Sequence, residues 1–138
     1  GKTAKDVGEA EAAAHILGYT CANDVTARDL QTDTNQWTVA KGFDTFCPLG
    51  PCIATDVDPG SLEIRLTLNG EERQHSNTRH LLFTPAYLVS YLSHIFELHP
   101  GDVILTGTPE GIGPMEIGET GKVEIEGIGA LTSVVGKR

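Results

Sequence analysis

The chain has 138 residues, 39% of them hydrophobic and 21% charged, which is ordinary for one globular domain with a real core. Nineteen acidic and ten basic side chains give a net charge of −9 without a cluster of lysines or arginines, which argues against nucleic acid and anionic membranes as partners. No apolar run approaches the roughly 20 residues of a membrane span, and no signal-peptide pattern opens the chain. We therefore expect one domain, residues 1–138, in the cytoplasm.

The three cysteines fit that compartment. Cys21, Cys47 and Cys52 are odd in number, form no C-x-x-C pair and match no common zinc spacing. We expect buried free thiols in a reducing environment rather than a catalytic or metal-binding group.

A helix is the first predicted element. Asp6 can cap it, a glutamate follows three residues later as in a capping box, and residues 10–14 have high helix propensity. Gly18 is expected to end this helix. Residues 19–24 then predict a short strand that delivers Asp24 to its end.

The middle of the chain alternates between loops and short strands. Residues 32–37 are rich in Asn, Asp and Thr and predict a loop, and residues 51–55 predict a short strand among glycines and prolines. Residues 62–68 alternate apolar with polar side chains and run into Asn69-Gly70. This is the pattern of a hairpin with a type I′ turn, whose return strand should cover 71–75.

A second helix and three further strands complete the prediction. Pro85 fits the first turn of that helix. Its buried face is expected to consist of Leu88, Tyr91, Leu92 and Ile95. The three strands are predicted over residues 103–106, which should be buried, 122–126 and 130–135. Many short strands with two main helices predict an α+β domain rich in antiparallel sheet.

Residues 23–31 concentrate polar side chains directly after a predicted strand. Asp24 lies where a rigid scaffold commonly presents groups to a cleft, but one carboxylate cannot hold Mg²⁺ or Mn²⁺ by itself. A cap or turn hydrogen bond is therefore an open interpretation for Asp24, and Asp29 is expected to point elsewhere. Arg28 can pair with a neighbouring carboxylate, orient Asp24 or clamp a substrate carboxylate.

Lys41 and Thr108 are further candidates. Lys41 lies between small residues in a segment without helical pattern, where the backbone could approach a ligand. A surface lysine is the default, while a functional one would neutralise charge or form a Schiff base. Residues 107–113 lack the G-K-[ST] ending of a phosphate loop, so no nucleotide is expected. Thr108 would still offer a hydroxyl and a backbone N–H to a carboxylate. The histidines have no metal-ligand spacing.

Several segments resemble the fumarylacetoacetate hydrolase family, in order along nearly the whole chain. They are Gly18-Tyr19-Thr20, residues 23–31, the segment from Trp37 to Lys41, Asn69-Gly70 with Arg73-Gln74, and the segment from Gly101 to Pro109. The resemblance implies a mixed β-sandwich roll of short strands that works as a homodimer. It also implies a Mg²⁺- or Mn²⁺-dependent enzyme that acts on small 2-oxo acids or dicarboxylates through an enolate chelated to the metal.

The same resemblance implies roles for five residues. Asp24 would be a metal ligand and Lys41 a catalytic residue that neutralises charge on the bound oxygens. Arg28, Gln31 and Thr108, together with Lys41, would hold the substrate.

One feature of the family is absent from these 138 residues. Its other two metal ligands are glutamates of a Glu-x-Glu strand just upstream of the first helix, where the His/Glu base of hydrolytic members also lies. Glu9 and Glu11 have that spacing but fall in the predicted helix. We therefore expect the chain to be part of a longer catalytic domain and to bind metal poorly alone.

Residues 37–48 most resemble the bacterial branch of 2-hydroxyhepta-2,4-diene-1,7-dioate isomerases, so isomerisation or decarboxylation of such an acid in aromatic catabolism is the expected activity. Acylpyruvate hydrolysis, which breaks a C–C bond of a β-diketone, and oxaloacetate decarboxylation need the same enolate and stay open. An alternative of another class is a non-catalytic dimerisation or binding domain.

Overall fold

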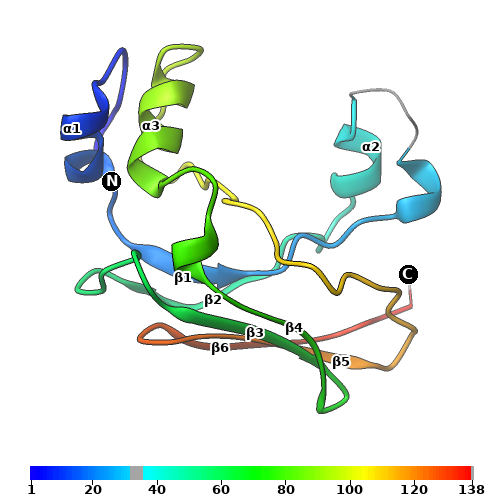
Figure 1. Ribbon diagram of the computed structural model, residues 1–138. Coiled ribbons are helices and arrows are strands. Elements are labelled where there is room, and N and C mark those ends of the chain that lie inside the picture. Colours follow the sequence, from blue (N-terminus) through cyan, green and yellow to red (C-terminus); the bar gives the residue numbers. More distant parts are fainter. Residues whose placement is uncertain (32–35, 138) are drawn as a thin grey trace.

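Two antiparallel sheets and a helical layer make up the computed structural model, which describes residues 1–31 and 36–137 (Figure 1). Strands β1 (Tyr19–Ala22) and β2 (Leu49–Ala54) pair with each other between the helices and a four-stranded sheet. That sheet has the order β4-β3-β5-β6 and consists of β3 (Glu63–Leu68), β4 (Glu71–Asn77), β5 (Thr120–Ile125) and β6 (Gly129–Val134). The predicted α+β class with largely antiparallel strands is confirmed.

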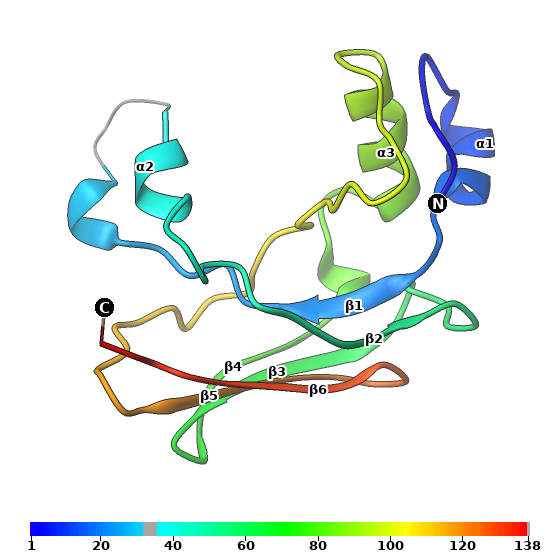
Figure 2. The same ribbon diagram turned by 180° about the vertical axis from the view of Figure 1, so that it is seen from behind.

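The helices are short and lie at opposite ends of the β1–β2 pair. α1 (Glu9–Ala12) and α3 (Pro85–Ser93) lie side by side at one end, and α2 (Thr38–Lys41) lies at the other (Figure 2). In the described part of the chain, three 3-10 turns accompany them: η1 (Ala13–His15), η2 (Arg28–Leu30) and η3 (Thr78–His80). Within the described ranges, no helix is long and apolar enough to cross a bilayer.

Local sequence signals located most strands and one helix correctly. The hairpin of β3 and β4 turns at Asn69 and Gly70, whose φ angles of 51° and 85° match the predicted type I′ turn. α3 begins at Pro85 as predicted, capped by the Thr84 hydroxyl, which accepts the Tyr87 N–H at 3.0 Å. Of the predicted loop over 32–37, residues 32–35 lie outside the described part.

The start of the first helix differs from the prediction. Its N-cap is Gly8, without a side-chain cap, whereas Asp6 has a left-handed φ of 52° and pairs with His94 at 3.2 Å. The Asp6 N–H is bound to the Ser93 carbonyl at 3.1 Å, so this turn docks the chain onto α3 before the helix begins. The helix also ends before Gly18, where an added Cβ would clash with the carbonyl oxygen of Ala54 in β2.

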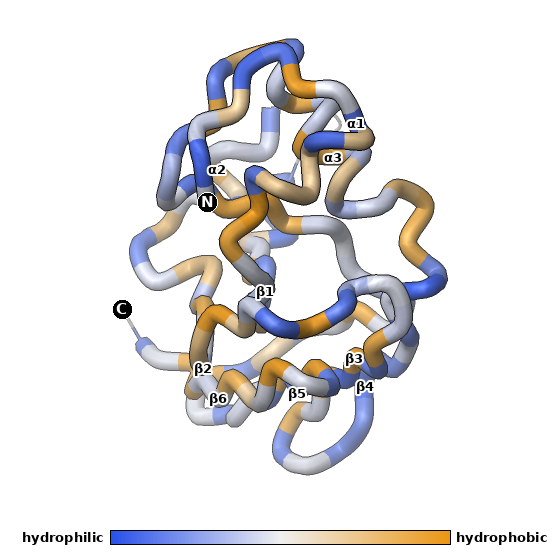
Figure 3. Tube along the Cα trace, turned by 90° about the vertical axis from the view of Figure 1, so that its left-hand side faces the viewer, coloured by the Kyte–Doolittle hydropathy of each residue, from blue (hydrophilic) through white to orange (hydrophobic). Residues whose placement is uncertain are grey.

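Apolar residues recur along both the helices and the strands (Figure 3), and the buried ones form two clusters. The helical cluster comprises Ala4, Val7, Ala12, Val89 and Leu98. The sheet cluster comprises Cys21, Leu62, Val123 and Ile128, and partly buried residues of β1, β3, β5 and β6 pack against it. Cys21 is buried as predicted, whereas Cys47 is half-buried and Cys52 is exposed, its thiol donating to the Ile128 carbonyl at 3.4 Å.

The predicted buried face of α3 is wrong for Tyr91 and Ile95, whereas Leu92 is partly buried against the helical cluster and Leu88 is half-buried. Val89 and Ser93 are buried, while Tyr91 and Ile95 are 54% and 59% exposed. The helix packs against the narrow N-terminal segment, and the Ser93 hydroxyl accepts the Val7 N–H at 3.0 Å, so small and polar side chains suit that contact. The rings of Phe83, Tyr87 and Tyr91 instead stack along the outer side, with centroids 4.8 and 6.2 Å apart.

The predicted buried strand over 103–106 is also wrong. This segment has no assigned strand pairing, and Val103 and Leu105 are 53% and 41% exposed. A short apolar run does not by itself specify a strand, because the partner strand must come from elsewhere in the fold.

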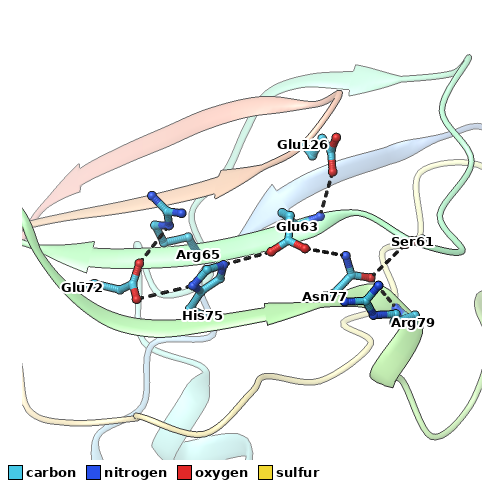
Figure 4. Close-up of polar contacts among 8 residues, drawn as sticks. All are labelled: Ser61, Glu63, Arg65, Glu72, His75, Asn77, Arg79 and Glu126. Carbon is cyan, nitrogen blue, oxygen red and sulfur yellow. Dashed lines mark hydrogen bonds and ion pairs between the residues drawn. The ribbon is translucent and has the colours of Figure 1, made fainter.

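A polar network covers the outer face of the β3–β4 hairpin (Figure 4). The Glu63 carboxylate accepts a hydrogen bond from Asn77 Nδ2 and another from His75 Nε2, each at 2.9 Å. The bond from Asn77, and then the one from His75, lowers the pKa of the Glu63 carboxyl below its ordinary value of 4.5. His75 also faces Glu72, which pairs with Arg65 at 3.0 Å.

This network predicts a pH dependence of stability. Because folding lowers the pKa of Glu63, its ionised carboxylate stabilises the folded state. This stabilisation is complete above the ordinary glutamate pKa of 4.5 and is lost as the pH falls through the lower pKa of the folded state. The urea midpoint of the wild type should therefore exceed that of Glu63→Gln at about pH 7, and the difference should shrink towards about pH 3. Glu71→Gln is the control, since that carboxylate is 73% exposed and 3.7 Å from Arg73. A difference that stays constant with pH would contradict the assignment.

Candidate active site

Three side chains from two segments meet just past the end of β1. Lys41 forms an ion pair with Asp24 and donates a hydrogen bond to Thr26 Oγ1 at 3.2 Å. A backbone bond from the Ala27 N–H to the Ala40 carbonyl, 2.9 Å long, ties the two segments together. The side chains of Lys41 and Asp24 remain 30% and 39% exposed, so a ligand can reach both.

The surroundings of these residues agree with the prediction in part. Asp24 follows β1 as expected. The expectation of a non-helical setting for Lys41 is wrong, because Lys41 is the last residue of α2 and its N–H bonds to the Trp37 carbonyl at 3.1 Å. The single turn of α2 therefore places the Lys41 ammonium group in contact with Asp24.

Arg28 and Gln31 form a second pair. Arg28 opens the 3-10 turn η2, and its guanidinium donates to Oε1 of Gln31, the residue that ends the turn. Asp29, in the same turn, is exposed and does not line the groove described below, as predicted.

Thr108 is held from the four-stranded sheet. Gln74 of β4, only 9% exposed, donates from Nε2 to Thr108 Oγ1 at 2.8 Å and to the Pro109 carbonyl at 2.6 Å. Gly111 lies so close to β4 that an added Cβ would clash with the Arg73 carbonyl oxygen. The loop therefore packs against β4 through the hydrogen bonds of the Gln74 side chain and through the close approach of Gly111 to the Arg73 backbone.

All five predicted site residues line one wide groove of about 1450 Å³. They are Asp24, Arg28, Gln31, Lys41 and Thr108. Asp24 contacts Lys41 and Arg28 contacts Gln31, while Thr108 bonds to Gln74 and so belongs to a separate part of the lining. A cation beside hydroxyl and amide donors can hold an anion such as a carboxylate.

Two groove residues were missed as site residues. Thr26 belongs to the motif around Asp24, and its hydroxyl, which donates to the Asp24 carbonyl at 3.1 Å, accepts from Lys41. Gln74 is a buried polar residue on a strand whose neighbouring residues, Arg73 and His75, are exposed. The period-two pattern of that strand could have marked Gln74 as an inward-facing polar group.

The described side chains fit a divalent cation only in part. Mg²⁺ and Mn²⁺ bind several oxygen ligands, usually including more than one carboxylate or several waters. Asp24 and Asp102 are the carboxylates in the groove lining, and Asp102 accepts the His99 N–H at 2.7 Å. No group of three His, Cys, Asp or Glu side chains that could hold a metal occurs in the described residues. By themselves these residues do not complete a cation site.

Solved structures share this fold closely. A 2-hydroxyhepta-2,4-diene-1,7-dioate isomerase from Mycobacterium marinum is 51% identical with a TM-score of 0.97, over all of this chain and 55% of that one. A fumarylpyruvate hydrolase from Pseudomonas aeruginosa, in complex with Mn²⁺ and pyruvate, is 40% identical with a TM-score of 0.94, over all of this chain and 62% of that one.

Sequence comparison agrees with the structural match. A mitochondrial oxaloacetate tautomerase of Xenopus laevis is 44% identical in an alignment 147 residues long, gaps included, which covers 98% of this chain and 46% of that protein. The chain spans about half the length of curated relatives such as this one. The C-terminal domain of fumarylacetoacetate hydrolases matches residues 1–136. The chain therefore belongs to the fumarylacetoacetate hydrolase family.

Proposed function

We propose that the full-length protein is an enzyme that acts on small 2-oxo acids or dicarboxylates by way of an enolate. Isomerisation of a substrate of the 2-hydroxyhepta-2,4-diene-1,7-dioate type is the reaction we favour. The observation that carries the proposal is the Lys41 ammonium group, held by Asp24 and Thr26 while still exposed to the groove. The isomerase from Mycobacterium marinum, 51% identical, supports this choice of reaction.

Each residue has a distinct proposed role. Lys41 stabilises the negative charge that develops on the substrate oxygens, because a positioned cation lowers the energy of an oxyanion as it forms. Arg28 and Gln31 orient a substrate carboxylate from one part of the lining, and Thr108 donates a hydrogen bond from another. Asp24 positions the ammonium group of Lys41.

We further propose that Asp24 is one ligand of a Mg²⁺ or Mn²⁺ ion, whose other ligands come from residues outside these 138. Such a cation supplies Lewis-acid stabilisation of negative charge on oxygen. The Mn²⁺ and pyruvate bound to the fumarylpyruvate hydrolase support the metal and the 2-oxo acid class. Residues 1–138 would then be the C-terminal part of a catalytic domain, and a homodimer in the cytoplasm is the state we expect.

A second candidate reaction is hydrolysis of an acylpyruvate, which the relative that binds pyruvate favours. Tautomerisation of oxaloacetate is a related possibility, favoured by the Xenopus laevis relative. These reactions and the decarboxylation of oxaloacetate require the same enolate, so a panel of substrates separates them better than any single residue does.

The metal proposal predicts a selective effect of Asp24→Asn in the full-length protein. Removing one carboxylate charge should weaken Mn²⁺ binding, measured by calorimetry, on the order of 10- to 100-fold. Asp29→Asn is the matched control, because Asp29 lies on the same segment but outside the groove lining. Unchanged Mn²⁺ affinity in Asp24→Asn, with no turnover of any 2-oxo acid by the wild type, would favour a non-catalytic binding or dimerisation domain instead.

A further inference from the structure

The loop that carries Thr108 is anchored by a hydrogen-bonding pattern that fixes the direction of each bond. Gln74 Nε2 lies 2.6 Å from the Pro109 carbonyl oxygen and 2.8 Å from Thr108 Oγ1. A carbonyl oxygen only accepts, so the Gln74 atom that faces Pro109 must be the amide nitrogen rather than the amide oxygen. The orientation of the carboxamide therefore follows from chemistry alone.

This orientation decides the role of the Thr108 hydroxyl. An amide NH₂ group has two protons and does not accept, so one proton goes to the Pro109 carbonyl and the other to Thr108 Oγ1. Thr108 Oγ1 is thus an acceptor towards Gln74, and its own proton must point elsewhere. Across residues 1–31 and 36–137, Gln74 is the one hydrogen-bond partner of this hydroxyl.

The proton of Thr108 is available to the groove. Thr108 is exposed where it lines the groove, while Gln74, which also belongs to the lining, is buried. The bonds to Gln74 and the close seat of Gly111 against Arg73 hold the loop on β4. A hydroxyl that accepts from Gln74 in this way has its own proton left to donate to a ligand in the groove.

We propose that Gln74 is a positioning residue for ligand binding. It occupies the acceptor side of Thr108 and so directs the Thr108 proton to a carboxylate or oxyanion in the groove. The inference rests on the proposed function, because it assumes an anionic ligand. It goes beyond that function in assigning to a buried residue a role that is exerted through Thr108.

A purely structural role for Gln74 makes a different prediction. If Gln74 only anchored the loop, the hydrogen bond from its side chain to the Pro109 carbonyl would suffice and the Thr108 hydroxyl would not matter. Replacing Thr108 with valine keeps its shape but removes the hydroxyl, so the two roles separate in a double-mutant cycle.

The test uses the full-length protein with saturating Mn²⁺ and oxalate as the probe, followed by calorimetry. Thr108→Val and Gln74→Met should each weaken oxalate binding about 10- to 100-fold, the usual cost of losing a hydrogen bond to a charged group. The double variant should lose no more than the worse single variant, and Thr108→Ser should retain affinity near that of the wild type. Gln74→Glu should lose at least as much as Gln74→Met, because a carboxylate accepts the Thr108 proton and repels the Pro109 carbonyl. Additive losses, or unchanged affinity in Thr108→Val, would overturn the proposal.

A second measurement keeps the inference separate from the proposed function. In ¹⁵N-glutamine-labelled protein, both side-chain amide protons of Gln74 should be protected from exchange, and Thr108→Val should move one of them selectively. If the wild type does not bind oxalate, the proposed function fails. In that case a selective shift still supports the positioning of Thr108 by Gln74, and an unmoved amide signal overturns it.

Discussion

Replacing Lys41 with methionine should lower the turnover of a 2-oxo acid by the full-length protein on the order of 10²- to 10³-fold. Methionine keeps much of the length and the apolar stem of lysine but removes the charge that we assign to the developing oxyanion. Asp24 would lose its ion-pair partner, while α2 and the backbone bond from Ala27 to Ala40 should persist. Steady-state kinetics with the substrate panel, alongside circular dichroism, measure the two effects separately.

Lys122→Met is the matched control for this variant. Lys122 lies on β5, pairs with Glu124 at 2.8 Å, and does not line the groove. A surface pair of this kind contributes about 0–1 kcal/mol, so activity should stay near that of the wild type. Equal losses in both variants would remove Lys41 from the reaction.

Trapping with borohydride separates the two chemical roles still open for Lys41. A Schiff base between Lys41 and a 2-oxo acid would be reduced to a stable adduct with a matching mass increase, whereas charge stabilisation leaves the mass unchanged. We expect no adduct, because the ammonium group is held in an ion pair with Asp24.

Gly111→Ala should be the most damaging glycine substitution in the loop that carries Thr108. Gly111 has a φ of 98°, and a Cβ there would clash with the Arg73 carbonyl oxygen, a backbone atom that cannot move without moving β4. We expect a loss of roughly 2–4 kcal/mol in the free energy of unfolding, measured with urea. Because the same movement would pull Thr108 away from Gln74, oxalate affinity should fall with it.

The neighbouring glycines supply graded controls. Gly107 has a φ of 113°, but an added Cβ would have nothing within 4 Å, so Gly107→Ala introduces backbone strain without a clash. Gly113 has neither feature, and Gly113→Ala should be close to neutral. If the three variants were equally stable, the close contact between Gly111 and the Arg73 backbone of β4 would not exist in solution.

The elements predicted correctly are those specified by neighbouring residues. The hairpin of β3 and β4 follows from strict alternation into Asn69-Gly70, and the start of α3 follows from Pro85, whose fixed φ suits a first helical turn. The buried face of α3 could not be predicted in this way, because its partners lie far away in the sequence: the Val7 N–H bonds to Ser93, 86 residues on. Hydrophobic periodicity cannot reveal that Val89 and Ser93, rather than Tyr91, face Ala4, Val7 and Ala12.

In the candidate site, too, features set by neighbouring residues were predictable and contacts between distant residues were not. Asp24 at the end of β1 followed from local pattern, whereas its ion pair with Lys41, 17 residues further along, depends on a helical turn that the sequence did not suggest. Gln74 and Thr108 are 34 residues apart, and no local rule pairs them. The chemical roles of Asp24, Arg28, Gln31, Lys41 and Thr108 remain predictions that come from the resemblance to the family.

The division of the core into two clusters bears on how the protein unfolds. The helical cluster and the sheet cluster have no buried residue in common, and they meet along the chain where η1 runs into β1. Opening of α1 and α3 as a subglobal unit therefore leaves β1 paired with β2, and with it the base on which Asp24 and Lys41 stand. Such an opening would move the part of the groove lined by Val89 and Leu98, while the ion pair between Lys41 and Asp24 could stay formed.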